Sequence, residues 1–92
     1  MFERFGSRWA LLVLLTLHGQ GVLRFSQLAK AVPGGVSERM LAVTVRDLEQ
    51  AGLVAREVYP EVPPRVEYRL TPKGESLVPL LRQLLDWAEK NA

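Results

Sequence analysis

A Pro-Gly-Gly tripeptide at residues 33–35 constrains the fold of this chain more than any other feature. Proline cannot continue a helix and glycine permits a sharp turn, so the tripeptide must separate two elements. The segment before it predicts a short helix from Ser26, as N-cap, to about Val32, with the preceding Phe25 packed back onto that helix. The tripeptide is therefore the turn between two consecutive helices.

The segment after the turn predicts a longer helix with two distinct faces. Ser37 is a suitable N-cap, the helix should end at Gln50 or Ala51, and Gly52 is well placed to terminate it. At about 100° per residue, one side of this helix collects the residues of a buried stripe. The stripe consists of Leu41, Thr44, Val45 and Leu48.

Two strand-like runs follow, at residues 53–59 and 65–70. In the second run apolar and charged residues alternate, which is typical of a strand with one buried face. Three prolines within residues 60–64 stiffen the connection and prevent strand pairing there. The pattern predicts a β-hairpin, and residues 22–24 form another short extended piece.

Two short helices joined by a tight turn and followed by a hairpin make a winged helix-turn-helix. We therefore expect an α+β, mostly helical fold with a wing of two or three strands and a C-terminal dimerisation helix. The chain should form a single domain over residues 1–92. Its parts are expected at about 26–51 for the helix-turn-helix, 53–70 for the wing and 72–90 for the terminal helix. A small α+β domain with an unrelated role is the alternative.

The N-terminal segment allows two interpretations. Residues 9–15 are all apolar, and Ser7 is a suitable N-cap for a helix that ends near Leu17. A signal peptide has a similar order of basic, apolar and small residues. Glu3 in the basic part and the lack of an Ala-x-Ala cleavage pattern favour the helix of a folded domain. The apolar run is also too short to span a membrane, so we expect no membrane partner.

The first and last helices are both expected to contribute to a subunit interface. A helix that is apolar on all sides must be covered on all sides, which one small core does not provide. Thr71 as N-cap and Pro72 at the first position begin the last helix, and Pro79 should kink it. Its apolar face is about 160° wide, broader than the ~100° that a single core requires; the alternative is a helix packed wholly on its own domain. The expected homodimer interface contains Trp9, Leu77, Leu80, Leu81, Leu84, Leu85 and Trp87.

Composition excludes several classes of function. Cysteine is absent, and one histidine and two aspartates leave little for a metal site or a catalytic triad. We therefore expect no cofactor, no metal and no enzymatic activity. The net charge of +2 is compatible with nucleic acid without requiring it.

The side of the longer helix opposite its buried stripe is suited to DNA. Arg39 and Arg46 lie there and flank Ala42 and Val43. Arginine binds guanine O6 and N7 with two hydrogen bonds, and small apolar side chains contact the thymine methyl group. Arginines that are simply solvated are the alternative.

Three further positions are candidates for contacts with the DNA backbone. Ser26 and Ser37 would cap helix N-termini, where free N–H groups and the helix dipole favour phosphate, although capping alone explains them equally well. Arg65 stands at the base of the proline-rich loop, whereas Glu61 at its tip repels phosphate. The expected DNA contacts are Ser26, Ser37, Glu38, Arg39, Ala42, Val43, Arg46 and Arg65.

Several stretches of the sequence resemble the HxlR-type regulators, a branch of the MarR-related winged-helix transcription factors. The most specific is Tyr-Pro-Glu-Val-Pro-Pro-Arg-Val-Glu-Tyr at residues 59–68, followed by Leu-Thr-Pro-Lys-Gly at 70–74. The similarity extends from about Gly6 to Trp87. The other matching stretches are 6–9 (Gly-Ser-Arg-Trp), 24–28 (Arg-Phe-Ser-Gln-Leu), 37–41 (Ser-Glu-Arg-Met-Leu) and 46–54 (Arg-Asp-Leu-Glu-Gln-Ala-Gly-Leu-Val).

This resemblance implies a homodimer joined through its terminal helices, located in the cytoplasm, that binds operator DNA with an inverted repeat. Some family members sense oxidants through a cysteine on an N-terminal arm, and this sequence has no cysteine to carry that switch. The family often has polar residues where this chain has Ala42 and Val43. A winged-helix module that dimerises without specific DNA binding is therefore the alternative function, and the sequence does not indicate a small-molecule effector.

Overall fold

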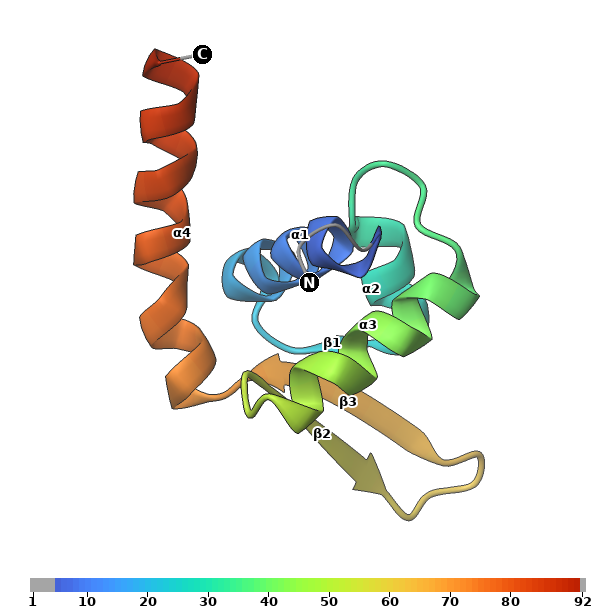
Figure 1. Cartoon of the computed structure of the whole chain (residues 1–92). Helices are drawn as coiled ribbons and strands as arrows, with labels where there is room; N and C mark the ends of the chain where they lie inside the picture. The colour runs from blue at the N-terminus through green and yellow to red at the C-terminus, as the bar shows by residue number, and fades with distance from the viewer. Residues whose placement is uncertain (1–4, 92) are drawn as a thin grey trace.

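A computed structural model describes the backbone of residues 5–91 and the side chains of residues 8–91, so Glu3 lies outside the described residues. The described residues form four helices and a three-stranded antiparallel sheet in the order of a winged helix-turn-helix, which confirms the predicted fold class (Figure 1). The elements are α1 (Phe5–Gln20), β1 (Leu23–Arg24), α2 (Phe25–Ala31), α3 (Glu38–Gln50), β2 (Val54–Tyr59), β3 (Arg65–Leu70) and α4 (Pro72–Lys90).

Strand β3 lies in the middle of the sheet, between β1 and β2. In its pairing with β2, Val54 lies opposite Leu70 and Tyr59 lies opposite Arg65. Side chains that lie opposite each other in the register share a face of the sheet. One face therefore buries Val54, Tyr68 and Leu70, and the other carries Glu57, Tyr59, Arg65 and Glu67.

The core lies between the helices and the apolar face of this sheet. Helix α3 contributes the stripe that the sequence predicts, and all four of its members are buried. Helix α1 contributes Val13, Leu14 and Leu17, while Leu12 and Leu15 are only half-buried, so the chain's own core covers this apolar helix incompletely. The remaining buried apolar side chains are Leu28, Val32, Val36, Val54, Tyr68, Leu70 and Val78.

Three of the predicted helix ends are confirmed, two by a capping hydrogen bond and one by its backbone conformation. The Ser37 hydroxyl accepts from the backbone N–H of Met40 at 3.1 Å, and the Thr71 hydroxyl accepts from that of Gly74 at 3.0 Å. Gly52 follows α3 with a φ of +78°, the left-handed conformation that glycine adopts without strain.

The predicted start of α2 is wrong. Ser26 is not an N-cap, because the helix begins at Phe25 and the cap position is Arg24. The side chain of Gln27 accepts from the Arg24 backbone N–H at 2.9 Å, so the helix start is fixed without Ser26. Phe25 is consequently part of the helix, and its ring packs against Tyr68 with centroids 6.4 Å apart. The α2 start is thus set by a glutamine three residues into the helix and by packing on β3.

Helix α1 is longer than the sequence predicts. It begins at Phe5, which places Ser7 in its first turn and not at the N-cap, and it continues past Leu17 to Gln20. Gly21, with a φ of +90°, ends it, and its N–H donates to the Leu17 carbonyl at 2.8 Å. None of the helices in the described part of the chain is long and apolar enough to cross a bilayer.

Helix α4 leaves the body of the molecule after its first turns. Val78 is fully buried, and Leu77 and Leu81 pack partly against the core. The helix continues through Pro79 to its end at Lys90. Figure 1 shows its C-terminal half standing away from the other elements, which gives the molecule its elongated extents of 50 × 26 × 22 Å.

Candidate nucleic-acid interface

Helix α3 presents a polar and small-apolar surface on the side that faces away from the core. Arg39 and Arg46 are exposed on that side, and neither forms an ion pair with another described residue. Between them Ala42 is half-buried and Val43 is 44% exposed. The structure therefore brings these four predicted residues together on one accessible helix surface.

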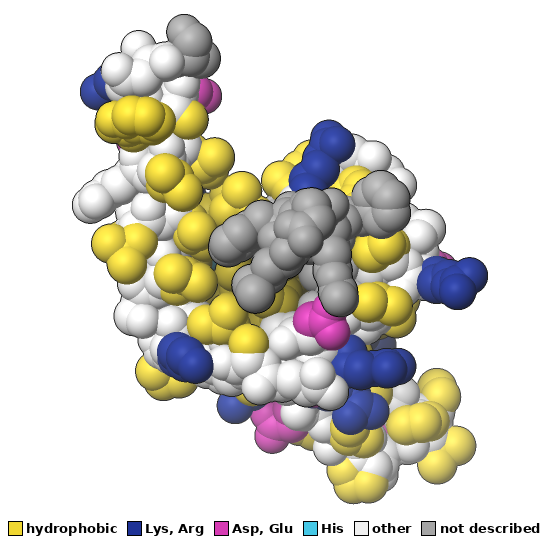
Figure 2. All heavy atoms as spheres, viewed as in Figure 1, with side chains coloured by type: hydrophobic (Ala, Val, Ile, Leu, Met, Phe, Trp, Pro, Cys, Tyr) yellow, Lys and Arg dark blue, Asp and Glu magenta, His cyan; other side chains and the backbone are white. Residues whose placement is uncertain are grey.

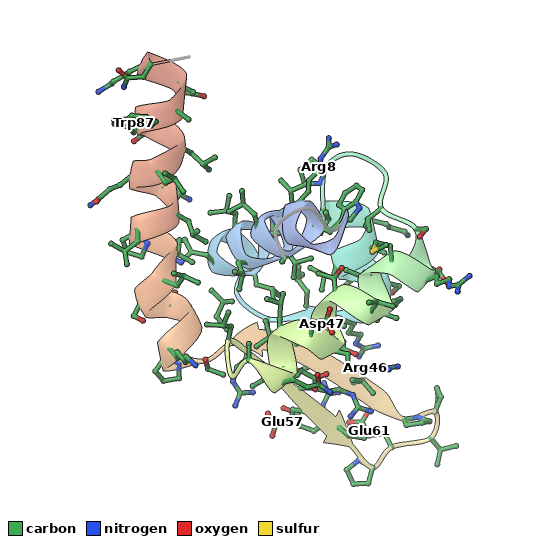
Figure 3. The ribbon with its side chains drawn as sticks, in the orientation of Figure 1. Arg8, Arg46, Asp47, Glu57, Glu61 and Trp87 are labelled. Atoms are coloured by element: carbon green, nitrogen blue, oxygen red, sulfur yellow. The ribbon has the colours of Figure 1, made fainter. Side chains whose placement is uncertain are left out.

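The positive charge on this helix is confined to two arginines and is not spread over its whole surface. Arg46 projects from α3 on the side of the hairpin, next to Asp47 in the chain (Figure 3). Glu38 occupies the first turn, where a carboxylate stabilises the positive end of the helix dipole. Because α3 carries three acids for its two arginines, any attraction for DNA is local to Arg39 and Arg46.

Arg65 lies at the start of β3 and is held by its own hairpin. Its guanidinium is 3.1 Å from the Glu61 carboxylate and 3.4 Å from that of Glu67. The same group stacks over the Tyr59 ring, with its Cζ atom 4.1 Å from the ring centroid. The sequence indicated that Glu61 would oppose phosphate, but it did not predict that Glu61 binds Arg65 directly.

The outer face of the hairpin is rich in carboxylates. Partial burial and the nearby charges of Glu57 and Glu67 raise the pKa of the Tyr59 phenol, against the opposite effect of Arg65. Arg69 donates to Glu57 at 2.7 Å, and this hydrogen bond raises the pKa of its guanidinium. Each arginine on this face therefore already has a carboxylate partner.

The two serines have different surroundings. The hydroxyl of Ser37 binds the Met40 N–H at the start of α3, while its side chain remains exposed. Ser26 lies exposed in the first turn of α2, and the capping role on which its phosphate contact was argued belongs to Arg24 and Gln27. Only Ser37 keeps the geometry that the sequence suggested.

A second exposed surface runs along α4 and is apolar. Leu84 is 61% exposed and Trp87 is 64% exposed, and Leu80 and Leu85 are also exposed. Figure 2 shows apolar side chains following α4 and continuing into the valley between this helix and the body of the molecule. We call Leu80, Leu84, Leu85 and Trp87 the α4 face; Trp87 lies near its free end (Figure 3).

The other predicted interface residues lie nearer to the core of their own chain. Leu77 and Leu81 are half-buried and pack against it. Trp9 is also half-buried, and its ring lies so close to Gly34 that a Cβ there would be 3.2 Å from it. Leu77 and Leu81 therefore border the α4 face, whereas Trp9 packs at the α2–α3 turn and is not brought together with that face.

Comparison with known proteins places the sequence among transcriptional regulators. A family model described as HxlR-like helix-turn-helix matches residues 4–92. An uncharacterized HTH-type transcriptional regulator of Methanothermobacter thermautotrophicus is 52% identical over 84 residues, covering 91% of this chain and 63% of that protein. The uncharacterized HTH-type transcriptional regulator YtfH of Escherichia coli is 49% identical over 85 residues, and the match covers 92% of this chain and 66% of YtfH. The chain thus spans slightly less than two thirds of these relatives.

Solved structures agree with the family match. The reduced form of the transcriptional regulator YodB from B. subtilis superposes with a TM-score of 0.81 at 36% identity, covering 92% of this chain and 81% of that one. At this identity the likeness extends to sequence as well as fold.

Proposed function

Because this chain belongs to the HxlR-like helix-turn-helix family, a family of transcriptional regulators and not of enzymes, we propose that it is a dimeric, sequence-specific DNA-binding regulator. In this proposal α3 is the recognition helix and enters the major groove, and the β2–β3 hairpin is the wing that lies along the adjacent backbone. The site of action is the cytoplasm.

The observation that carries the proposal is the surface of α3. Arg39 and Arg46 project from it with no carboxylate partner among the described residues. Ala42 and Val43 lie between them and form a small apolar surface. A surface of this kind fits base edges, since arginine forms a planar pair with guanine and Val43 can contact a thymine methyl. Ser37 and Glu38, at the N-terminus of α3, are the remaining proposed contacts of this helix.

The proposed dimer forms through the α4 face and the half-exposed side of α1. The α4 face is an exposed apolar surface of the kind that marks interaction sites, and it begins where the chain's own core ends, at Val78 and Leu81. A second copy offers an identical face, which a two-fold axis makes self-complementary. Two recognition helices so related read an inverted repeat with half-sites about 34–36 Å apart.

The experiment begins with selection of bound duplexes from a random pool. Arg39→Ala and Arg46→Ala are then titrated against the selected duplex and a scrambled one at several salt concentrations. At least one should lose about 1–3 kcal/mol on the selected duplex and relax the preference at one base pair per half-site. Arg65→Ala should weaken both duplexes alike and reduce the salt slope by about 0.9 per subunit.

Arg82→Ala is the matched control, because it removes the same charge from the water-facing side of α4, outside the α4 face. It should bind both duplexes like the wild type. If the α3 and wing variants also bind both duplexes like the wild type, these surfaces do not contact DNA and the proposal is wrong.

A protein-interaction module is the second candidate function. It is favoured by the wing, whose three arginines are matched by Glu57, Glu61 and Glu67. A module of this kind would dimerise through α4 but bind neither selected nor random duplexes at low salt. The titrations above therefore separate the two functions directly.

A further inference from the structure

Arg65, the wing residue for which a DNA contact is proposed above, forms ion pairs with two carboxylates of its own hairpin. Of the two carboxylates on Arg65, Glu61 lies in the loop between β2 and β3, whereas Glu67 lies in the centre of β3, opposite Glu57 and Arg24. The Glu61 side chain is 52% exposed and that of Glu67 only 21%. Of the two carboxylates, Glu61 is therefore the one that can be displaced from Arg65.

We propose that Glu61 is an affinity-determining residue of the wing, which occupies Arg65 in the free protein and is displaced by a DNA phosphate on binding. This inference rests on the proposed DNA-binding function. It predicts that on DNA binding Arg65 exchanges its ion pair with Glu61 for one with a backbone phosphate.

The residues around Arg65 leave one side of its guanidinium accessible to a phosphate. Its Nε is buried without a hydrogen-bond partner, and its Nη1 is directed to Glu67. Tyr59 covers one side of the guanidinium. Nη2, the atom that faces Glu61 at 3.1 Å, is therefore the group that an external anion can reach.

Charge and geometry both allow phosphate to replace Glu61. Phosphate oxygens accept charge-assisted hydrogen bonds from a guanidinium as carboxylates do. The Glu61–Arg65 pair is partly open to solvent, and such pairs are weak, so its loss does not prevent the exchange. The three arginines and three glutamates of the wing give it no net charge, so its attraction for DNA depends on the release of Arg65 from Glu61.

The test is a double-mutant cycle measured on the selected duplex at low salt. Glu61→Gln keeps the shape of the side chain and removes its charge, and it should tighten binding by about two- to fivefold per subunit. Arg65→Met removes the guanidinium charge while keeping an apolar stem over Tyr59. In the Arg65→Met background, Glu61→Gln should change the affinity less than twofold.

Thermal unfolding of each variant by circular dichroism shows whether the wing still folds, and Arg65→Gln replaces Arg65→Met in the cycle if it does not. Equal tightening by Glu61→Gln in both backgrounds would mean that Glu61 acts only through net charge, and no tightening would mean that it does not restrain Arg65. Either result overturns the inference while the proposed function stands. If neither the wild type nor any variant binds a duplex, the proposed function falls, and the inference falls with it.

Discussion

The Lys73 ammonium donates a hydrogen bond to the backbone carbonyl of Ala51 at 2.9 Å, so the first turn of α4 is attached to the last turn of α3. The Thr71 hydroxyl donates to the Gly52 carbonyl at 2.6 Å, and the Thr71 N–H donates to Leu53 at 3.1 Å. This joint connects the proposed dimerisation helix with the proposed recognition helix. In the proposed dimer this joint would set the distance between the two recognition helices.

Thr71→Val should lower the free energy of unfolding by about 1–2 kcal/mol. Valine has nearly the same shape, but it lacks the hydroxyl that accepts from Gly74 and donates to Gly52. Urea unfolding at a fixed protein concentration measures the change. Ser26→Ala is the control, and it should stay within about 0.5 kcal/mol of the wild type because Ser26 caps no helix. A large loss for Ser26→Ala would contradict the α2 start described here.

Gly74→Ala should be more damaging than a usual glycine-to-alanine change in a helix. A Cβ on Gly74 would overlap the carbonyl oxygen of Leu53 and come within 3.3 Å of the Leu70 side chain. Since the obstacle is backbone, it cannot rotate away, and we expect a loss of about 1–3 kcal/mol. Gly19→Ala, in the last turn of α1 with open space around it, should instead gain about 0.5–1 kcal/mol. Equal melting temperatures for the two variants would show that the joint is not tightly packed.

The parts of the fold that the sequence predicted are those whose signals are local. The alternation at residues 65–70 gave β3 its observed bounds, and Thr71–Pro72 and Ser37 marked the helix starts, because caps and strand faces depend on neighbours in the chain. The start of α2 was missed because the N-cap was assigned from residue type alone. Ser26 matched the usual preference, but the Gln27 side chain reaches the Arg24 N–H and Phe25 packs on Tyr68 from β3, a contact that is remote in sequence.

In the candidate site, too, local features could be predicted from the sequence and contacts formed by the fold could not. The outward position of Arg39, Ala42, Val43 and Arg46 follows from helical periodicity alone. The state of Arg65 does not, because it depends on how the proline-rich loop folds back toward β3. The spacing of four residues between Glu61 and Arg65 was the only signal of their ion pair, and outside a helix that spacing does not imply contact. Such contacts become visible only in three dimensions.

Leu84→Glu should abolish the proposed dimer without unfolding the chain. Leu84 is 61% exposed in the single subunit, so a carboxylate there is hydrated until a second copy covers it, when its burial becomes costly. Sedimentation equilibrium at micromolar concentration should give the wild type twice the 10.3 kDa mass of one chain, and the variant about that of a single chain. Arg82→Glu, outside the α4 face, should remain dimeric. A wild type that sediments as a monomer would remove the basis of the dimer proposal.

Arg46→Lys should distinguish a base contact from a phosphate contact at the centre of the proposed interface. Lysine keeps the charge but loses the planar fork with which arginine binds guanine O6 and N7. If Arg46 contacts a base, Arg46→Lys should lose about as much affinity for the selected duplex as Arg46→Ala, about 1–3 kcal/mol, and keep wild-type affinity for scrambled DNA. The same pair of changes at Arg39 tests the other end of the helix surface. Full recovery of selected-duplex affinity by lysine at both positions would assign both arginines to the backbone and leave the reading of sequence to other residues.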